Sequence, residues 1–116
     1  MNLLGAAQIR ALAEKLDLKP TKKLGQNFVI DANICRKIVK LAQVSESDIA
    51  LEIGPGLGSL TLALLEQTKQ VVAVEIDNRL ANQLPITVTE NGFSSEKLIV
   101  INEDAMKLTH LDVKPT

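Results

Sequence analysis

The sequence predicts an α/β protein whose parallel sheet has about three strands and is preceded by N-terminal helices. Three observations support this fold class. From residue 48 onward, short apolar runs alternate with helical patterns. The runs at 70–76 and 97–102 are nearly continuous in aliphatic and β-branched residues, which is typical of strands covered on both faces. The stretch LEIGPGLGSL, residues 51–60, places a glycine-rich turn directly after the first apolar run. Together they indicate the strand–helix order of a parallel sheet.

The first part of the chain predicts two amphipathic helices joined by a basic loop. The first spans Leu3 to Leu16, and the second begins after Asp31, a good N-cap. Apolar residues at helical spacing are Ile9, Leu12, Ala13 and Leu16 in the first helix and Ile34, Cys35, Ile38, Val39 and Ala42 in the second. The loop DLKPTKKLGQNFVI lies between them.

The second part predicts strands and helices in strict alternation. The expected strands are 48–53, 70–76 and 97–102, and the expected helices are 59–68 and 77–84. Residues 85–97, PITVTENGFSSEK, contain Asn91-Gly92 and Ser94-Ser95, so we expect a turn-rich connection there. We therefore divide the chain into 1–47, the helices and their loop, and 48–116, the α/β part.

Composition limits the function classes. The 116 residues are 46% hydrophobic and contain no apolar run of membrane-spanning length, so we expect one cytoplasmic domain without a leader or membrane span. The net charge of −1 argues against nucleic-acid binding through charge alone. A lone Cys35 and a lone His110 exclude an internal disulfide and a cysteine/histidine metal site. We expect Cys35 to be a small filler of the core or the surface rather than a nucleophile, and His110 to be exposed.

The glycine turn predicts a ligand site. A glycine-rich turn between a parallel strand and a helix lets a ligand approach the backbone at the carboxyl edge of the sheet. The dinucleotide fingerprint G-x-G-x-x-G would require a glycine at position 59, which is Ser59, so the spacing disfavours a nicotinamide cofactor. The alternative is a turn that only packs its helix closely.

Two carboxylates strengthen the ligand interpretation. Glu75 ends the second strand about 20 residues after Gly54, where an acid can accept hydrogen bonds from both ribose hydroxyls. Asp104 follows the third strand, where it could accept a bond from an adenine amino group. Each acid alone could be a solvated or helix-capping residue. Their coincidence with the glycine turn favours a nucleoside ligand.

Four motifs, KKLGQNFVID, EIGPGLGSLT, VVAVEID and NEDAM, resemble the ribosomal RNA adenine dimethyltransferase family over about residues 4–108. The resemblance implies an incomplete Rossmann-like, S-adenosylmethionine-dependent methyltransferase fold. The activity that it implies for the parent enzyme is N6-dimethylation of two adjacent adenines near the 3′ end of small-subunit rRNA. The implied partner is therefore small-subunit rRNA or the immature small ribosomal subunit, during ribosome biogenesis.

The resemblance also implies which residues hold the cofactor. These are Gln26, Asn27, Val29, Gly54, Gly56, Glu75, Ile76, Asp104 and Ala105. Many relatives have glycine where this chain has Glu103, and we expect that side chain to point to solvent. Lys19, Lys22 and Lys23 could touch RNA phosphate, or could form a solvated basic loop.

One family motif is absent from this chain. The family's Asn-Leu-Pro-Tyr motif, which orients the flipped adenine, should follow Asp104 by a couple of dozen residues, but the sequence stops at Thr116. The family's C-terminal helical domain is absent too. We therefore assign no catalytic residue and no metal ligand, and expect this chain to bind cofactor at most and not to transfer methyl groups.

Two other functions remain open from the sequence. One is the related large-subunit rRNA adenine methyltransferase of the macrolide-resistance type. The other is a non-catalytic nucleotide-binding or ribosome-associated module that keeps the glycine turn for its shape alone. An open sheet edge would also allow self-association through the last strand.

Overall fold

The structure, a computed structural model, describes residues 3–16 and 32–107 of the chain. The elements are α1 (Ala6–Lys15), α3 (Ala32–Leu41), β1 (Ile49–Ile53), α4 (Ser59–Gln67), β2 (Gln70–Val74), α5 (Asn78–Glu90) and β3 (Leu98–Ile101), with short 3-10 helices η1 (Ser95–Lys97) and η2 (Ala105–Lys107). The predicted α/β class and the order of its elements are confirmed.

The three strands form one parallel sheet in the order β1-β2-β3. Its register aligns Ala50 with Val71 and Val71 with Leu98, so these residues lie in one row across the sheet. Because side chains alternate along a strand, such rows alternate between the two faces. The register therefore decides which side chains face the helices.

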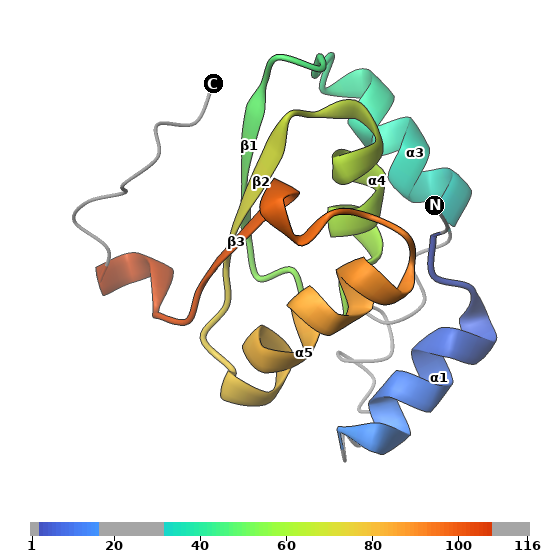
Figure 1. Ribbon diagram of the computed structural model, residues 1–116, viewed down its shortest axis with the longest axis vertical. Helices are drawn as coiled ribbons and strands as arrows, with labels where there is room; N and C mark the ends of the chain where they lie inside the picture. The colour runs from blue at the N-terminus through green and yellow to red at the C-terminus, as the bar shows by residue number, and fades with distance from the viewer. Residues whose placement is uncertain (1–2, 17–31, 108–116) are drawn as a thin grey trace.

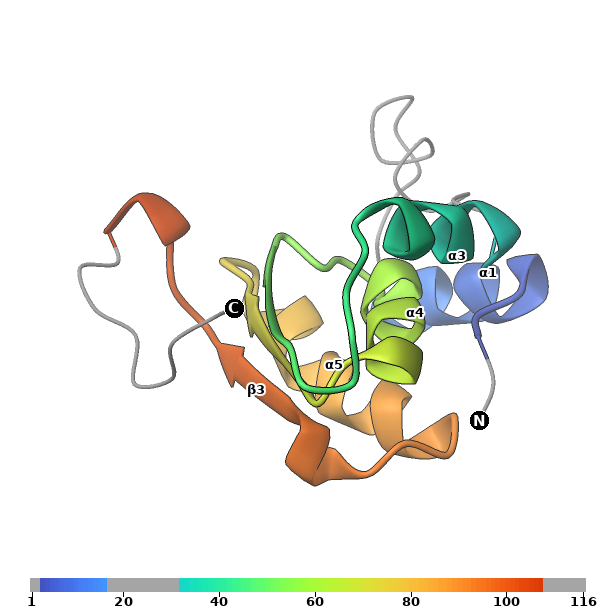
Figure 2. The ribbon, with the colours of Figure 1, turned by 90° about the horizontal axis from the view of Figure 1, so that it is seen from above.

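The helices α3, α4 and α5 lie on the same side of the sheet, as the two views in Figures 1 and 2 show. The helix α4 contacts β2, and α5 contacts β3. The strand residues in the core on this face include Val71 and Ala73, with Val100 packed against them. The hydrophobic core of the described residues therefore lies between the sheet and one layer of helices.

The other face of the sheet is only partly covered. Leu51 and Ile53 of β1 are 42% and 56% exposed, and Ile99 and Ile101 of β3 are half-buried. The prediction of strands covered on both faces is thus right for the central strand β2 and wrong for β3. A continuous apolar run predicts two-sided burial only where both faces receive helices, and here the described helices occupy one face.

The helix α4 is apolar almost all round because it lies between two layers. Its residues Thr61, Leu62, Ala63, Leu64 and Leu65 are all buried. The sheet covers one side of α4 and α3 covers the other. A helix enclosed on two sides needs no polar face, which explains the weak amphipathic pattern of its sequence.

The helix α3 buries less than its pattern predicts. Cys35 and Val39 are buried, which agrees with the filler role expected of Cys35. Ile34 and Ile38 are 51% and 43% exposed, and Ala42 is exposed beyond the end of the helix. The predicted helix is confirmed, and two of the five apolar residues at helical spacing are buried.

The helix α5 is longer than predicted. It runs to Glu90, so the prediction that residues 85–90 form part of a loop is wrong, and Pro85 lies inside the helix. Proline removes one backbone hydrogen bond from a helix interior. Burial of Leu84, Thr87 and Val88 on both sides of the proline continues the helical face and outweighs that loss. The turn at Asn91-Gly92 is confirmed.

The first helix, α1, confirms the predicted apolar spacing. Ile9 is buried, and Leu12, Ala13 and Leu16 are partly buried against the core. Arg79 at the start of α5 donates from Nη1 to the carbonyl of Leu16, at 2.9 Å. Among the described residues, no helix is both long and apolar enough to cross a membrane.

Candidate functional site

The glycine turn between β1 and α4 forms the centre of the candidate site. Gly56 has φ +59°, a left-handed conformation that favours glycine, and a side chain added there would meet no atom within 4 Å. Gly58 has φ +101°, and an added Cβ would lie 2.8 Å from Cδ1 of Leu84 in α5. Gly58 therefore permits close packing of α4 and α5, whereas Gly56 leaves its backbone accessible.

Hydrogen bonds bring the ends of the three strands together. The N–H of Gly54 donates to the carbonyl of Val74 at 2.8 Å, and the N–H of Glu75 donates to that of Ile101 at 2.9 Å. The side-chain amide of Asn102 donates to the carbonyl of Glu75 at 2.9 Å. The glycine turn, Glu75 and the residues after β3 consequently share the carboxyl edge of the sheet, where open α/β sheets bind ligands.

Glu75 lies directly behind the glycine turn and is buried, with 6% of its surface exposed. Its Oε1 accepts the N–H of Gly56 and its Oε2 accepts the N–H of Asp77, both at 3.1 Å. These bonds fix the carboxylate between the turn and the start of α5. Each carboxylate oxygen has two lone pairs, so Glu75 keeps capacity to accept bonds from ligand hydroxyls.

Asp77 caps the N-terminus of α5 next to Glu75. Its side chain accepts the backbone N–H groups of Arg79 and Leu80 at 2.8 and 3.2 Å. The side chain of Arg79 also donates to it at 3.3 Å. This side-chain bond, the larger cause, and the two backbone bonds lower the pKa of Asp77 below its usual range. The ionised carboxylate of Asp77 thus caps α5 and pairs with Arg79.

A second carboxyl, Glu52, lies beneath the turn. It belongs to the same row of the sheet as Ala73 and Val100, on the face that the helices cover, and is 8% exposed. The hydroxyl of Thr61 in α4 donates a short hydrogen bond to Oε1 of Glu52. This bond joins the strand before the glycine turn to the helix after it.

Burial raises the pKa of Glu52 to about 7. Loss of solvent around the carboxylate is the largest cause, and the negative charge of Glu75 adds to it. The hydrogen bond from Thr61 stabilises the ionised form and acts in the opposite direction. Glu52 therefore changes its charge near neutral pH, which is unusual for a glutamate.

Asp104 is separated from the end of β3 by two residues and is half-buried. Its Oδ1 accepts the N–H of Met106 at 3.0 Å, so part of its role is to cap η2. Ala105 is half-buried, and Ile76 is 66% exposed beside Glu75. Glu103 is exposed, as expected. The structure thus places Asp104 at the same edge of the sheet as Glu75, with one of its oxygens engaged in a local turn.

Some predicted residues lie outside the described part of the chain. They are Gln26, Asn27 and Val29 of the expected cofactor loop, the basic residues Lys19, Lys22 and Lys23, and His110. Their roles remain predictions.

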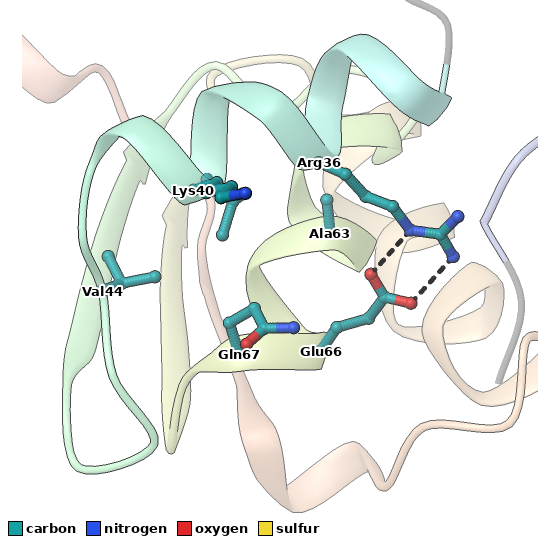
Figure 3. Close-up of a pocket in the computed structure, with 7 residues that line it drawn as sticks. Arg36, Lys40, Val44, Ala63, Glu66 and Gln67 are labelled. Carbon is teal, nitrogen blue, oxygen red and sulfur yellow. Dashed lines mark hydrogen bonds and ion pairs between the residues drawn. The ribbon is translucent and has the colours of Figure 1, made fainter.

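A separate cavity of about 480 Å³ lies at the far end of α4 from the glycine turn. Figure 3 shows it between α3 and α4. There the guanidinium of Arg36 donates two hydrogen bonds to the carboxylate of Glu66, from Nη2 at 3.1 Å and from Nε at 3.2 Å. This carboxylate also raises the pKa of Arg36, first through the hydrogen bond and then through its charge. The cavity is remote from the three strand ends, so its size does not make it the candidate site.

Sequence reasoning missed three residues of the site. Glu52 offered one signal, because a charge within the apolar run DIALEI is unexpected in a buried strand. Thr61 offered none, because nothing in the run SLTLALLEQ indicates that its hydroxyl has a particular partner. Asn102 could have been noticed as a polar residue at a strand end, in line with Glu75. Glu52 and Thr61 bond to each other across the glycine turn, and Asn102 bonds to the end of a different strand.

The arrangement suits a ligand with hydroxyl groups and some positive charge. It offers an accessible glycine backbone and buried carboxylates as acceptors at the end of the sheet. Among the residues that the structure describes, no three histidine, cysteine, aspartate or glutamate side chains could together hold a metal ion.

Two solved structures that resemble this chain are a dimethyladenosine transferase and an rRNA methyltransferase. A dimethyladenosine transferase from Plasmodium falciparum superposes with a TM-score of 0.63 at 34% identity, over 71% of this chain and 29% of that protein. The 23S rRNA methyltransferase ErmE superposes with a TM-score of 0.61 at 29% identity, over 72% of this chain and 32% of that protein. Both similarities confirm the Rossmann-like methyltransferase fold.

Curated relatives are more similar in sequence. Ribosomal RNA small subunit methyltransferase A of Corynebacterium jeikeium is 59% identical over 112 residues, which are 97% of this chain and 35% of that protein. The protein of the same name from Leifsonia xyli is 53% identical over 116 residues, 99% of this chain and 41% of that protein. The chain thus spans about two-fifths or less of the length of these relatives.

A family model gives the assignment directly. The model of the ribosomal RNA adenine dimethylase family matches residues 18–113, which is most of the chain and includes the glycine turn, Glu75 and Asp104. These are the positions that the structure gathers at one edge of the sheet. This chain therefore belongs to the ribosomal RNA adenine dimethylase family.

Proposed function

We propose that this chain is the S-adenosylmethionine-binding part of an rRNA adenine N6-dimethyltransferase. The observation that carries the proposal is the buried Glu75 carboxylate, hydrogen-bonded to Gly56 of the glycine turn at the carboxyl edge of the sheet. In this proposal Glu75 and Ile76 hold the ribose, and Gly54 and Gly56 approach the methionine part. Asp104 and Ala105 hold the adenine, and Gln26, Asn27 and Val29 cover the methionine.

When bound, S-adenosylmethionine supplies the methyl group. The residues of this chain bind and orient it, because the glycine turn and the carboxylates are fixed before the ligand arrives. Fixed acceptors lose little entropy on binding, which favours affinity and a defined position for the donor methyl. The acceptor adenine is then positioned by residues of the parent enzyme beyond those assigned here.

The proposed substrate is small-subunit rRNA, within an immature small ribosomal subunit in the cytoplasm. Curated relatives that share more than half of their aligned residues with this chain carry the small-subunit name. ErmE, a 23S rRNA methyltransferase, is 29% identical. This difference in identity favours the small subunit over the large subunit, which is the second candidate. Lys19, Lys22 and Lys23 are proposed to contact RNA phosphates.

Calorimetric titration of this chain with S-adenosylhomocysteine and, separately, with NAD tests the cofactor assignment. We expect binding of S-adenosylhomocysteine and none of NAD. Replacing Glu75 by alanine should weaken the binding by about 1.5–3 kcal/mol, the range for a hydrogen bond to a charged group. The matched control is Glu103→Ala, an exposed acid near Asp104 whose loss should leave affinity unchanged. Binding of NAD alone would overturn the assignment.

A tritiated-methyl transfer assay tests the activity. The acceptor is immature small subunits, and the comparison is between this chain and a relative of full length. We expect transfer by the full-length relative and none by this chain alone, because positioning of the acceptor contributes roughly 7–11 kcal/mol to such reactions. Turnover by this chain above a no-enzyme control would show that the catalytic residues lie within it. Methylation of large-subunit rRNA by the relative would favour the second candidate.

A further inference from the structure

Two buried carboxyls lie near the glycine turn, and they approach it from different elements. Glu75 follows β2 and binds the turn at Gly56. Glu52 lies within β1 and binds α4 through Thr61. Both side chains are more than nine-tenths buried. Glu52 has no role in the cofactor contacts proposed above, so its burial beneath the turn calls for a separate explanation.

The charged groups around Glu52 leave the pair of carboxyls without a described counter-cation. Thr61 faces Glu52 from α4, and Glu75 acts on it from the end of β2 through charge. Arg79 of α5 bonds Asp77 and the carbonyl of Leu16. Arg36 of α3 forms an ion pair with Glu66 of α4 at 3.1 Å. When Glu52 is ionised, the region beneath the turn thus carries two negative charges from the described residues.

We infer that Glu52, together with Glu75, makes the glycine-turn site prefer a cationic ligand over a neutral ligand of the same shape. This inference rests on the proposed function, in which S-adenosylmethionine is the ligand. Its sulfonium is positive, whereas the sulfur of the product S-adenosylhomocysteine is neutral. An ionised Glu52 attracts the donor more than the product, because charges interact strongly in a partly buried site. Glu52 is therefore a specificity-determining residue that favours exchange of product for donor.

The test measures the ratio of the two dissociation constants by calorimetry, with S-adenosylmethionine and S-adenosylhomocysteine as the ligands. It compares the wild-type chain with Glu52→Gln. Glutamine has the same shape and still accepts the hydrogen bond of Thr61, but it cannot carry charge. We expect the preference for the cationic ligand to fall about five- to tenfold in Glu52→Gln at pH 8, because the substitution removes a negative charge from beneath the turn.

Two control variants separate charge from packing. Thr61→Val keeps the carboxyl but removes the hydrogen bond that stabilises its ionised form, so the ratio should reach its wild-type value only at a higher pH. Glu66→Gln removes an acid from the far end of α4, next to the cavity, and should change neither affinity. Because the folded wild-type protein already accommodates a neutral Glu52 below pH 7, we expect Glu52→Gln to fold.

A pH series supplies the same test without a substitution. Between pH 6 and 7 the amino group of the ligand stays mostly protonated, since free α-amino groups titrate near about 7.7–8.0. Over this range the wild-type preference for S-adenosylmethionine over S-adenosylhomocysteine should rise with pH. The preference of Glu52→Gln should stay constant. A flat wild-type ratio, or equal ratios in the two proteins at pH 8, overturns the inference and leaves the proposed function standing. Failure of the wild type to bind either ligand overturns both.

Discussion

At the scale of single residues, the site depends on groups that stabilise the fold and are also proposed to contact the ligand. Glu75 holds the glycine turn and the start of α5 before any ligand is present. The three glycines likewise differ in purpose although they alternate regularly in sequence. Gly56 leaves its backbone open, and Gly58 allows α4 to approach Leu84. Substitutions at these positions should therefore separate ligand affinity from stability.

The glycines give the first prediction. Gly58→Ala should destabilise the fold by about 1–3 kcal/mol, because the new methyl group overpacks the contact with Leu84 and the left-handed backbone is strained. Gly56→Ala is its matched counterpart and should cost about 1–2 kcal/mol from backbone strain alone. Only Gly56→Ala should also block S-adenosylhomocysteine. Urea unfolding and calorimetry measure the two effects, and normal affinity in Gly56→Ala would contradict this division.

The second prediction concerns the pH dependence of stability. The pKa of Glu52 is raised from 4.5 to about 7 on folding, so the folded state binds more protons than the unfolded state between these values. The contribution of Glu52 to stability is therefore full below pH 4.5 and is lost as the pH rises to 7. The loss is on the order of 3 kcal/mol. Asp77 affects stability in a different pH range. Because its pKa is lowered on folding, its contribution to the free energy of unfolding is lost only as the pH falls below about 4.

Urea unfolding at pH 5 and pH 8 provides the measurement. The wild-type chain should be less stable at pH 8, and Glu52→Gln should lose much of this difference because glutamine does not titrate. Asp77→Asn is the control, since its effect lies at lower pH and should leave the change between pH 5 and 8 in place. Identical pH profiles for the wild type and Glu52→Gln would show that Glu52 titrates normally.

At the scale of elements, burial decides where helices begin and end. The helix α5 continues through Pro85 because buried residues on both sides of the proline keep one face against the core. The helix α3 exposes Ile34 and Ile38 because α4 covers only its other side. Local propensity is a weak determinant in both cases, since tertiary contacts supply most of the stability of a helix.

The third prediction tests this balance in α5. Pro85→Ala should stabilise the chain by about 1–2 kcal/mol, because alanine restores a backbone donor and has a higher helix propensity. The greater entropy of the unfolded chain without the proline offsets a small part of this gain. The control is Asn82→Ala, at an exposed position of the same helix, which should change stability by only a few tenths of a kcal/mol. Urea unfolding of both variants gives the comparison. A destabilised Pro85→Ala would mean that packing of the proline ring outweighs the helix.

At the scale of the whole molecule, the described sheet has two free edges and one poorly covered face. The strand β2 pairs on both sides, whereas β1 and β3 each pair with β2 alone. Leu51 and Ile53 of β1 are the most exposed aliphatic residues of the sheet. Exposed apolar side chains next to unpaired backbone groups favour association between sheets. Association should therefore involve β1 at least as much as the last strand.

The fourth prediction is that this chain associates with itself as its concentration rises. Sedimentation should show an apparent mass that increases with concentration, because pairing at the edge covers apolar surface. Ile53→Lys should reduce the association, since a charge on an edge strand opposes pairing. Ile86→Lys, at an exposed site on α5, is the control and should leave the association unchanged. A mass independent of concentration would contradict the prediction.

The sequence by itself determined the order of the strands and helices, the position of the glycine turn and the placement of Glu75 behind it. These features follow from local patterns: apolar periodicity, the turn chemistry of glycine, and the direction of parallel strands, which places their ends at one edge. Only the tertiary structure decided which apolar faces are buried, that α5 passes through Pro85, and that Glu52 lies beneath the turn. The physical reason is that burial and pKa depend on neighbours distant in sequence. Register places Glu52 beside Ala73 and facing Thr61, and no local pattern encodes that pairing.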